Sequence, residues 1–126
     1  MTPHFSDAEL ACQCGCGMLP QEDFMQKVET LRLRYGKPLK VTSAARCPEH
    51  NAKISSTGRN GPHTTGRAID FGISGSEAHR LLALAMDSGF TGIGVNQKGP
   101  HEKRFLHTDD LPDAPGQPRP TVWSYP

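Results

Sequence analysis

Two histidines and one aspartate have the residue types of a metal site. His63 and Asp70 are seven residues apart, and His107 follows later in the string RFLHTDD. Two histidines and one carboxylate are a common three-ligand set for catalytic zinc, with the fourth position left for water. Asp109 lies two residues after His107, so both side chains point to the same face if this string is a strand. The residue types are therefore consistent with a zinc site formed by His63, Asp70 and His107.

A purely structural interpretation of the same residues stays open at this point. Asp70 lies inside a predicted strand with one apolar face, and a buried carboxylate is costly unless it has a partner. A salt bridge to Arg67 or Arg104 would meet that need. Histidines on apolar strands are often hydrogen-bonded core residues. Spacing alone does not decide between these interpretations.

Helices are predicted from apolar spacing and from capping residues. Apolar residues recur at helical spacing over 21–35, where a glycine and a proline end the pattern. A second apolar stripe covers 78–86, and Ser74 with Glu77 forms a capping-box pattern before it. The same pattern predicts a short helical turn at 6–10. These helices alternate with predicted strands, which the turn residues delimit.

The predicted strands are 39–43, 67–73, 90–95 and 105–108. Residues 48–65 are rich in Gly, Asn, Ser and Thr, so we expect a long loop, which is usually functional or mobile in a small domain. The order of elements predicts an α+β fold, in which helices flank a mostly antiparallel sheet. We expect a single domain over 1–126, with an N-terminal arm at 1–20 and a Pro-rich C-terminal tail at 110–126.

Length and composition exclude several classes of protein. The 126 residues fit one domain, and the net charge of +1 with dispersed basic residues makes nucleic acid a poor partner. No apolar run approaches the roughly 18 residues of a membrane span. The opening string MTPHFSDAEL lacks the basic and apolar regions of a secretory signal. We therefore expect a monomer made in the cytoplasm, without membrane or nucleic-acid partners.

Four cysteines form a second group of residues with metal-binding chemistry. Cys12, Cys14 and Cys16 lie in the string CQCGCG, and Cys47 lies much later in the chain. A cytosolic protein normally keeps cysteines as thiols. Three states stay open: free thiols that hold the arm, a disulfide from Cys47 to one of the others, and a four-thiolate zinc site. The CxCxC spacing differs from the CxxC that is usual in such zinc sites.

Five strings of the sequence resemble motifs of one peptidase family. HTTGRAIDF resembles the HxxGxAxD signature of the zinc D-Ala-D-Ala carboxypeptidase family, whose relatives include phage cell-wall endopeptidases, D-Ala-D-Ala dipeptidases and the zinc domain of hedgehog proteins. In chain order, CGCG resembles part of FSxxEFxCxCG, SAARCPEHN resembles SGYRxxxxN, GFTGIGV resembles GFxGIGxY, and FLHTD resembles FxHxD. The sequence departs from the pattern at Gly61, where serine is frequent, and at Ala45, where an aromatic residue is frequent. The resemblance covers nearly the whole chain.

The resemblance implies a zinc peptidase with the hedgehog/D-Ala-D-Ala peptidase fold. His63, Asp70 and His107 match the family's ligands, so one catalytic zinc ion is expected. Arg46 matches the arginine that contacts substrate, and its guanidinium can bind a carboxylate through two hydrogen bonds. A structural salt bridge is the alternative role for Arg46. The expected substrates are peptidoglycan stem peptides, cut by either carboxypeptidase or endopeptidase action.

The resemblance also limits the search for a general base. In the family this residue lies a few positions before the last zinc ligand, where Glu102 and His101 are the titratable residues. Glu102 is the first choice, and the alternative is a solvated residue at a hairpin tip beside Lys103. Asp109 is expected to orient a histidine ligand.

Two other functions are consistent with the same fold. The chain could be a non-catalytic zinc-binding module, as hedgehog-type relatives illustrate, or a structural part of a virion. The feature that separates these functions from a peptidase is whether Glu102 or His101 can face the metal. The absence of a signal and of a wall-binding module favours a phage or prophage product. Such a lysin would reach the cell wall after release or as a virion component.

Overall fold

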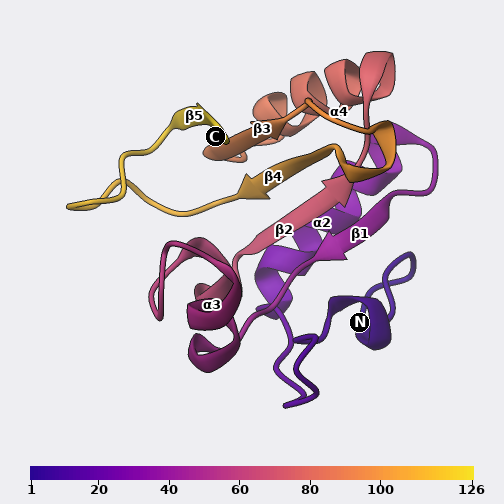
Figure 1. The fold of residues 1–126 in the computed structure, drawn as a ribbon. Coiled ribbons are helices and arrows are strands. Elements are labelled where there is room, and N and C mark those ends of the chain that lie inside the picture. Colours follow the sequence, from indigo (N-terminus) through magenta and orange to yellow (C-terminus); the bar gives the residue numbers. More distant parts are fainter.

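A five-stranded sheet forms the centre of the computed structural model, which describes residues 1–126 (Figure 1). The strands are β1 (Lys40–Ser43), β2 (Ala68–Gly72), β3 (Gly92–Asn96), β4 (Phe105–Asp109) and β5 (Thr121–Ser124). Their order across the sheet is β1-β2-β4-β3-β5. All neighbours are antiparallel except β3 and β5, which run parallel. The predicted α+β fold with a mostly antiparallel sheet is confirmed.

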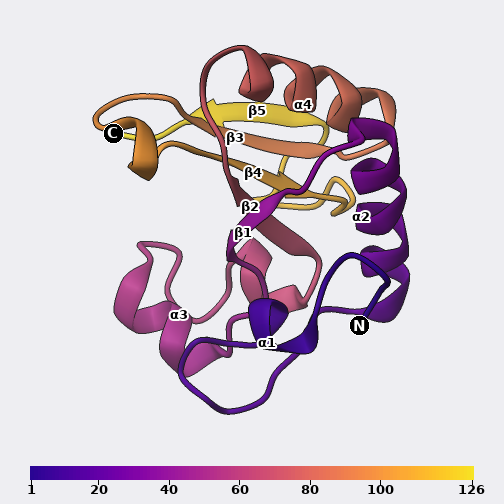
Figure 2. The ribbon, with the colours of Figure 1, turned by 90° about the vertical axis from the view of Figure 1, so that its right-hand side faces the viewer.

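Two helices, α2 (Glu22–Tyr35) and α4 (Gly75–Asp87), cover one face of this sheet, while α3 (Pro48–Ile54) lies on the side away from α2 (Figures 1 and 2). The hydrophobic core lies between the sheet and the two long helices. Its buried side chains include Ile69, Phe71, Ile93 and Leu106 from the strands and Phe24, Val28, Leu31, Leu81 and Ala85 from the helices. None of the helices combines the length and apolar character needed to cross a membrane.

Capping residues set the ends of the helices in the first third of the chain. The short helix α1 (Asp7–Leu10) begins at Ser6, whose hydroxyl accepts from the Glu9 amide while the Glu9 carboxylate accepts from the Ser6 amide. This is the predicted capping box. Helix α2 ends at Gly36, which adopts the left-handed conformation that favours glycine.

Two local predictions are wrong. Residues 48–65 are not one loop, because they contain α3 and the 3₁₀ turn η1 (Pro62–Thr65). A cysteine, Cys47, caps α3 through its sulfur, and the usual capping residues are absent there. The predicted capping box at α4 is not formed: Ser74 makes no side-chain cap, and Glu77 binds the Tyr35 hydroxyl and Lys37 instead of the Ser74 amide.

The C-terminal tail is more ordered than its proline content predicts. Residues 121–124 form β5, which pairs in parallel with β3 at the edge of the sheet. Proline is tolerated beside an edge strand, where fewer amides take part in the ladder. This edge strand places the last residues of the chain beside the sheet face opposite α2 and α4.

Candidate metal centre

Strand register places two of the predicted ligands side by side. Asp70 of β2 pairs directly with His107 of β4, which pairs in turn with Gly94 of β3. Trp123 of β5 continues this row opposite Gly94. Directly paired residues point to the same face of a sheet. Asp70, His107 and Trp123 therefore share the sheet face that α2 and α4 leave free.

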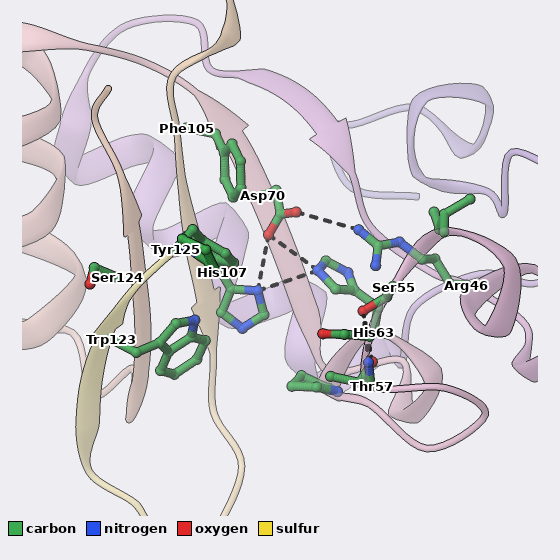
Figure 3. Close-up of a pocket in the computed structure, with 14 residues that line it drawn as sticks. Arg46, Ser55, Thr57, His63, Asp70, Phe105, His107, Trp123, Ser124 and Tyr125 are labelled. Atoms are coloured by element: carbon green, nitrogen blue, oxygen red, sulfur yellow. Dashed lines mark hydrogen bonds and ion pairs between the residues drawn. The ribbon is translucent and has the colours of Figure 1, made fainter. Parts of the chain in front are cut away.

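His63 reaches the same place from η1, the turn that precedes β2. Gly66 ends this turn with a positive φ of 74°, which a glycine adopts without strain. Figure 3 shows the rings of His63 and His107 and the carboxylate of Asp70 pointing toward one another. All three residues are buried, with 5%, 2% and 6% of their surface exposed, in the order His63, His107, Asp70. We call these residues the three-ligand centre.

The donor atoms of the three-ligand centre are closely spaced. Asp70 Oδ1 lies 3.2 Å from His63 Nε2 and 3.0 Å from His107 Nδ1, and the two nitrogens are 3.3 Å apart. Tetrahedral zinc with bonds of about 2.0–2.1 Å places its ligand atoms about 3.3 Å apart. The three donors therefore fit a single zinc ion, and side-chain rearrangement of no more than a few tenths of an ångström is needed.

Each histidine is held in the tautomer that a metal requires. His63 Nδ1 donates to the Ala44 carbonyl at 2.7 Å, and His107 Nε2 donates to Asp109 Oδ2 at 2.8 Å. These hydrogen bonds leave His63 Nε2 and His107 Nδ1 as the nitrogens that face Asp70. Outer partners of this kind orient metal-binding histidines and increase their basicity.

The members of the three-ligand centre shift one another's pKa values. Burial raises the pKa of the Asp70 carboxyl, but the neighbouring His63 and His107 more than offset this and hold the pKa well below its usual range. Burial lowers the pKa of His107, and its hydrogen bonds to Asp109 and Asp70 raise the pKa above the ordinary value. His107, which lies between two carboxylates, therefore holds a proton more readily than a free histidine does. A metal ion that binds here displaces this proton.

Asp109 is itself held by a residue that sequence reasoning missed. The Arg119 guanidinium donates to both oxygens of Asp109, through Nε at 2.9 Å and Nη2 at 2.8 Å. Burial raises the pKa of Asp109, but His107 and Arg119 more than offset this and lower it. A Cβ atom at Gly92, directly opposite Asp109, would collide with this carboxylate. Arg119 lies in the Pro-rich tail, where no spacing in the sequence points to it.

Arg46 lies beside the three-ligand centre and forms an ion pair with Asp70, so its role in substrate binding stays a prediction. Its Nη2 is 3.6 Å from Asp70 Oδ2, while Nε donates to Ser43 Oγ at 2.9 Å and Nη1 donates to Asn51 Oδ1 at 3.0 Å. Burial lowers the pKa of Arg46, which Asp70 partly offsets. Two N–H groups of the guanidinium remain for a ligand, because three contacts use three of its five donors.

The charged partners predicted for Asp70 are engaged elsewhere. Arg67 pairs with Asp110 and Asp23, and Arg104 donates to the Gly99 carbonyl. The Asp70 carboxylate is instead shared among His63, His107 and Arg46. The simple salt-bridge interpretation of Asp70 through Arg67 or Arg104 is therefore wrong.

The three-ligand centre lies at the floor of a cavity of about 510 Å³. One wall consists of the end of α3 and the residues after it, 54–57, and the other consists of the C-terminal residues 123–126. Trp123 lies 5.0 Å from the His107 ring, and Tyr125 lies 5.1 Å from the Phe105 ring, between ring centroids. Burial raises the pKa of Tyr125 to about 12, so its hydroxyl stays protonated at neutral pH.

Glu102 and His101 do not line this cavity. Both lie in the 3₁₀ turn η2 (His101–Lys103), and both are exposed. The turn is close to the cavity, because Phe105 lines the cavity and Lys98 of the same hairpin donates to the Tyr125 carbonyl at 2.9 Å. A base is often too distant in a free enzyme and approaches its target only with substrate bound. The base role of Glu102 or His101 therefore stays a prediction.

Comparison with known proteins identifies the class of protein that this fold and site form. The sequence model of one family, described as Peptidase M15, matches residues 3–109. This range contains all three ligands and Arg46. The chain belongs to the Peptidase M15 family, which is a family of metallopeptidases and is zinc-dependent in general. No curated protein matches the chain.

Proposed function

We propose that this protein is a zinc-dependent peptidase that cuts peptide bonds in the stem peptides of bacterial peptidoglycan. The observation that supports this most directly is the position of Arg46. This half-buried cation, whose side chain is 14% exposed, adjoins Asp70, so that a zinc ligand and a carboxylate-binding group meet at the floor of one cavity. A peptide that ends in a free carboxylate would place its last peptide bond next to the three-ligand centre.

The chain's own residues have distinct roles in this proposal. His63, Asp70 and His107 would hold zinc, which supplies a Lewis acid that polarises a carbonyl and acidifies water. Arg46 binds the substrate carboxylate, and its bonds to Ser43 and Asn51 keep the guanidinium in place. Glu102 or His101 accepts a proton from the attacking water and returns it to the leaving amine.

A pair of substrates tests the role of Arg46. A stem peptide with a free C-terminal D-Ala-D-Ala and the same peptide as its C-terminal amide differ only at the carboxylate. We expect the wild-type protein to prefer the free acid in kcat/KM, and Arg46→Lys to lose most of that preference, because an ammonium cannot reproduce the planar fork. Zinc content should stay unchanged in the variant. Equal hydrolysis of acid and amide by the wild type would favour an endopeptidase that does not read the chain end.

Metal dependence is tested on peptidoglycan itself. Purified cell walls should release new amino groups when the zinc-loaded protein is added, and a chelator should stop this release. His63→Ala should abolish the reaction. His79→Ala is the matched control, because His79 is exposed on α4 and lies outside the cavity. Activity that survives in His63→Ala would overturn the proposal. Hydrolysis of walls added from outside also fits a lysin released from cells or carried by a virion.

One observation favours a second function, a non-catalytic zinc-binding module. Neither Glu102 nor His101 lines the cavity, so the structure places no assigned base beside the three-ligand centre. This function predicts stoichiometric zinc at the three-ligand centre and no hydrolysis of any stem peptide. Measurement of zinc content and turnover on the same sample distinguishes the two functions.

A further inference from the structure

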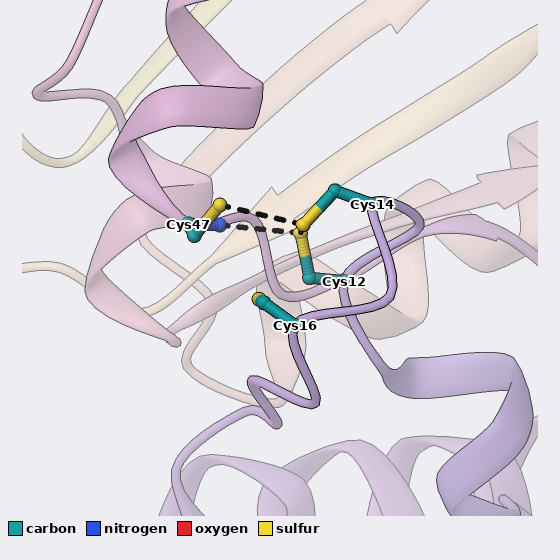
Figure 4. A group of neighbouring side chains, drawn as sticks. All are labelled: Cys12, Cys14, Cys16 and Cys47. Atoms are coloured by element: carbon teal, nitrogen blue, oxygen red, sulfur yellow. Dashed lines mark hydrogen bonds between the residues drawn. The ribbon is translucent and has the colours of Figure 1, made fainter.

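The four cysteines converge on one point although they come from separate parts of the chain. Cys12, Cys14 and Cys16 lie in the N-terminal arm, and Cys47 precedes α3 (Figure 4). The four sulfur atoms all lie within 4.8 Å of one another. The sulfur of Cys14 is 3.4 Å from that of Cys12 and 3.6 Å from that of Cys47. We call this group the cysteine cluster.

We propose that the cysteine cluster binds a second zinc ion, which has a structural role. Tetrahedral zinc with Zn–S bonds of about 2.3 Å places its sulfur ligands about 3.8 Å apart. The observed separations are close to this value, and every sulfur is near the three others. Disulfides would join the sulfurs in pairs at about 2.05 Å, which does not require all four to meet. On binding, the four thiols lose their protons to solvent and act as thiolates.

The backbone around the cysteine cluster is shaped to bring the sulfurs together. Gly15 and Gly17 have positive φ values of 88° and 87°, and they alternate with the cysteines of the arm. The Gly15 amide donates to the Cys12 carbonyl at 3.1 Å, which closes a tight turn. This turn allows cysteines two residues apart, which would lie in a row in an extended chain, to face a common point.

Backbone amides also favour thiolates at this point. The Cys47 amide donates to the Cys12 sulfur at 3.3 Å, and the His50 amide donates to the Cys47 sulfur at 3.4 Å. Outer hydrogen bonds of this kind orient metal ligands and stabilise their charge. A set of four protein ligands leaves no position for substrate or water, which is the arrangement of a structural zinc site.

The location of the cysteine cluster indicates what a zinc ion would stabilise. Cys47 directly follows Arg46, and the Ala45 amide donates to the Leu10 carbonyl of the arm at 3.2 Å. A zinc ion shared by the arm and Cys47 would fix the backbone on the C-terminal side of Arg46. The second zinc therefore acts as a clamp between the arm and the segment that presents Arg46 to the cavity.

Zinc content of the full chain tests this proposal independently of peptidase activity. The protein is prepared under a non-chelating phosphine reductant, loaded with zinc and desalted. We expect about two zinc ions per chain in the wild type and about one in Cys14→Ser and in Cys16→Ser, since structural zinc sites need all four ligands. Both cysteines are exposed, so the chain should still fold. His63→Ala should also retain about one zinc, because it leaves the cysteine cluster intact.

Gln13→Ser is the matched control within the same loop. Gln13 is exposed and donates to the Thr42 carbonyl at 2.9 Å, so its loss loosens the arm without removing a thiolate. This variant should keep about two zinc ions. As a second measurement, cobalt-loaded wild type should show a thiolate-to-cobalt charge-transfer band in the near ultraviolet, which Cys14→Ser should lack. The proposal would be overturned if the wild type binds only one zinc ion and the cysteine substitutions do not change that number. It would also be overturned if the intact mass of the wild type shows a disulfide.

Discussion

The three-ligand centre and the cysteine cluster are both suited to zinc, but different kinds of structure build them. Two paired strands and one 3₁₀ turn present His63, Asp70 and His107, and each histidine has an outer hydrogen-bond partner. The cysteine cluster is formed by an irregular arm and one residue before α3, and backbone amides bond only two of its four sulfurs, those of Cys12 and Cys47. Regular secondary structure therefore fixes the first set of ligands, whereas a zinc ion would add more to the order of the second.

Because the two sites are built differently, we expect different consequences when zinc is removed from each. Loss of metal from the three-ligand centre should remove chemistry and leave the fold in place, because the sheet and its 17-residue core do not depend on it. Loss of metal from the cysteine cluster should loosen the arm and the segment around Arg46, with a smaller and indirect effect on activity.

The largest effect is expected from Asp70→Asn. This substitution keeps the size of the side chain but removes the negative charge that both histidines and Arg46 share. Loss of zinc from the three-ligand centre forfeits several kcal/mol of transition-state stabilisation, so kcat/KM should fall about 10³-fold or more. The circular dichroism spectrum and zinc at the cysteine cluster should be retained. A variant that unfolds would show that the three-ligand centre also holds the fold.

Substitution of the predicted base should change turnover without changing either metal site. We expect Glu102→Ala to lower kcat by about 10²–10⁴-fold, the usual value of general acid–base catalysis. Glu102 is exposed, so zinc content and the unfolding midpoint should match the wild type. His101→Ala is the parallel variant, measured at equal zinc content. If both variants turn over at the wild-type rate, the base is another residue and Asp109 is the next to test.

A smaller effect, on zinc affinity, is expected from Asp109→Asn. This substitution tests how much Asp109 contributes to holding His107 in the orientation that binds zinc. Asp109 joins His107 to Arg119, and removal of its charge weakens the outer bond that orients the histidine. Outer partners of this kind contribute about 10–100-fold to metal affinity. A zinc-competition titration should show this loss at the three-ligand centre alone. Asp113→Asn is the control, because Asp113 is exposed and binds only the Arg119 backbone amide. Equal affinities in the two variants would contradict preorganisation by Asp109.

The sequence predicted the fold best where periodicity and capping act locally. Helix α2 follows its apolar spacing and ends at Gly36, and β2 and β4 fall where alternation placed them. Strand β5 could not be predicted, because an edge strand in a Pro-rich tail depends on tertiary pairing with β3. Helix α3 was missed because Cys47 replaces the usual capping residues.

In the candidate site, too, residues in local sequence motifs could be predicted, whereas residues that depend on tertiary contacts could not. The resemblance pointed to His63, Asp70 and His107, and the structure brings their donor atoms together. Arg119 could not be found, because its contact with Asp109 depends on how the tail returns along the sheet. Glycine is unfavourable inside a strand, yet β3 contains Gly92 and Gly94. Gly92 leaves room for the Asp109 carboxylate, and Gly94 leaves room for the Trp123 and Tyr125 rings.

The smallest effect is expected at Asp110, which helps to hold the end of β4 without any metal. Its side chain is only 2% exposed and binds Arg67 and Lys27, each at 2.7 Å. Hydrogen bonds to charged groups contribute about 1.5–3 kcal/mol, so Asp110→Asn should lower the free energy of unfolding by about 2 kcal/mol at pH 7. Asp87→Asn is the control, because its pair with Arg34 is exposed and surface pairs contribute about 0–1 kcal/mol.

The pH dependence of this difference identifies its origin. Burial raises the pKa of Asp110, but Arg67 and Lys27 more than offset this and hold the pKa below its ordinary value. A carboxyl with a lowered pKa in the folded state stabilises the protein above the unfolded pKa of about 3.9, and this contribution is lost as the pH falls through the folded value. Urea unfolding should therefore show a full difference between wild type and Asp110→Asn at pH 7 and a shrinking one below about pH 4. A difference that persists undiminished in acid would assign the effect to packing rather than to charge.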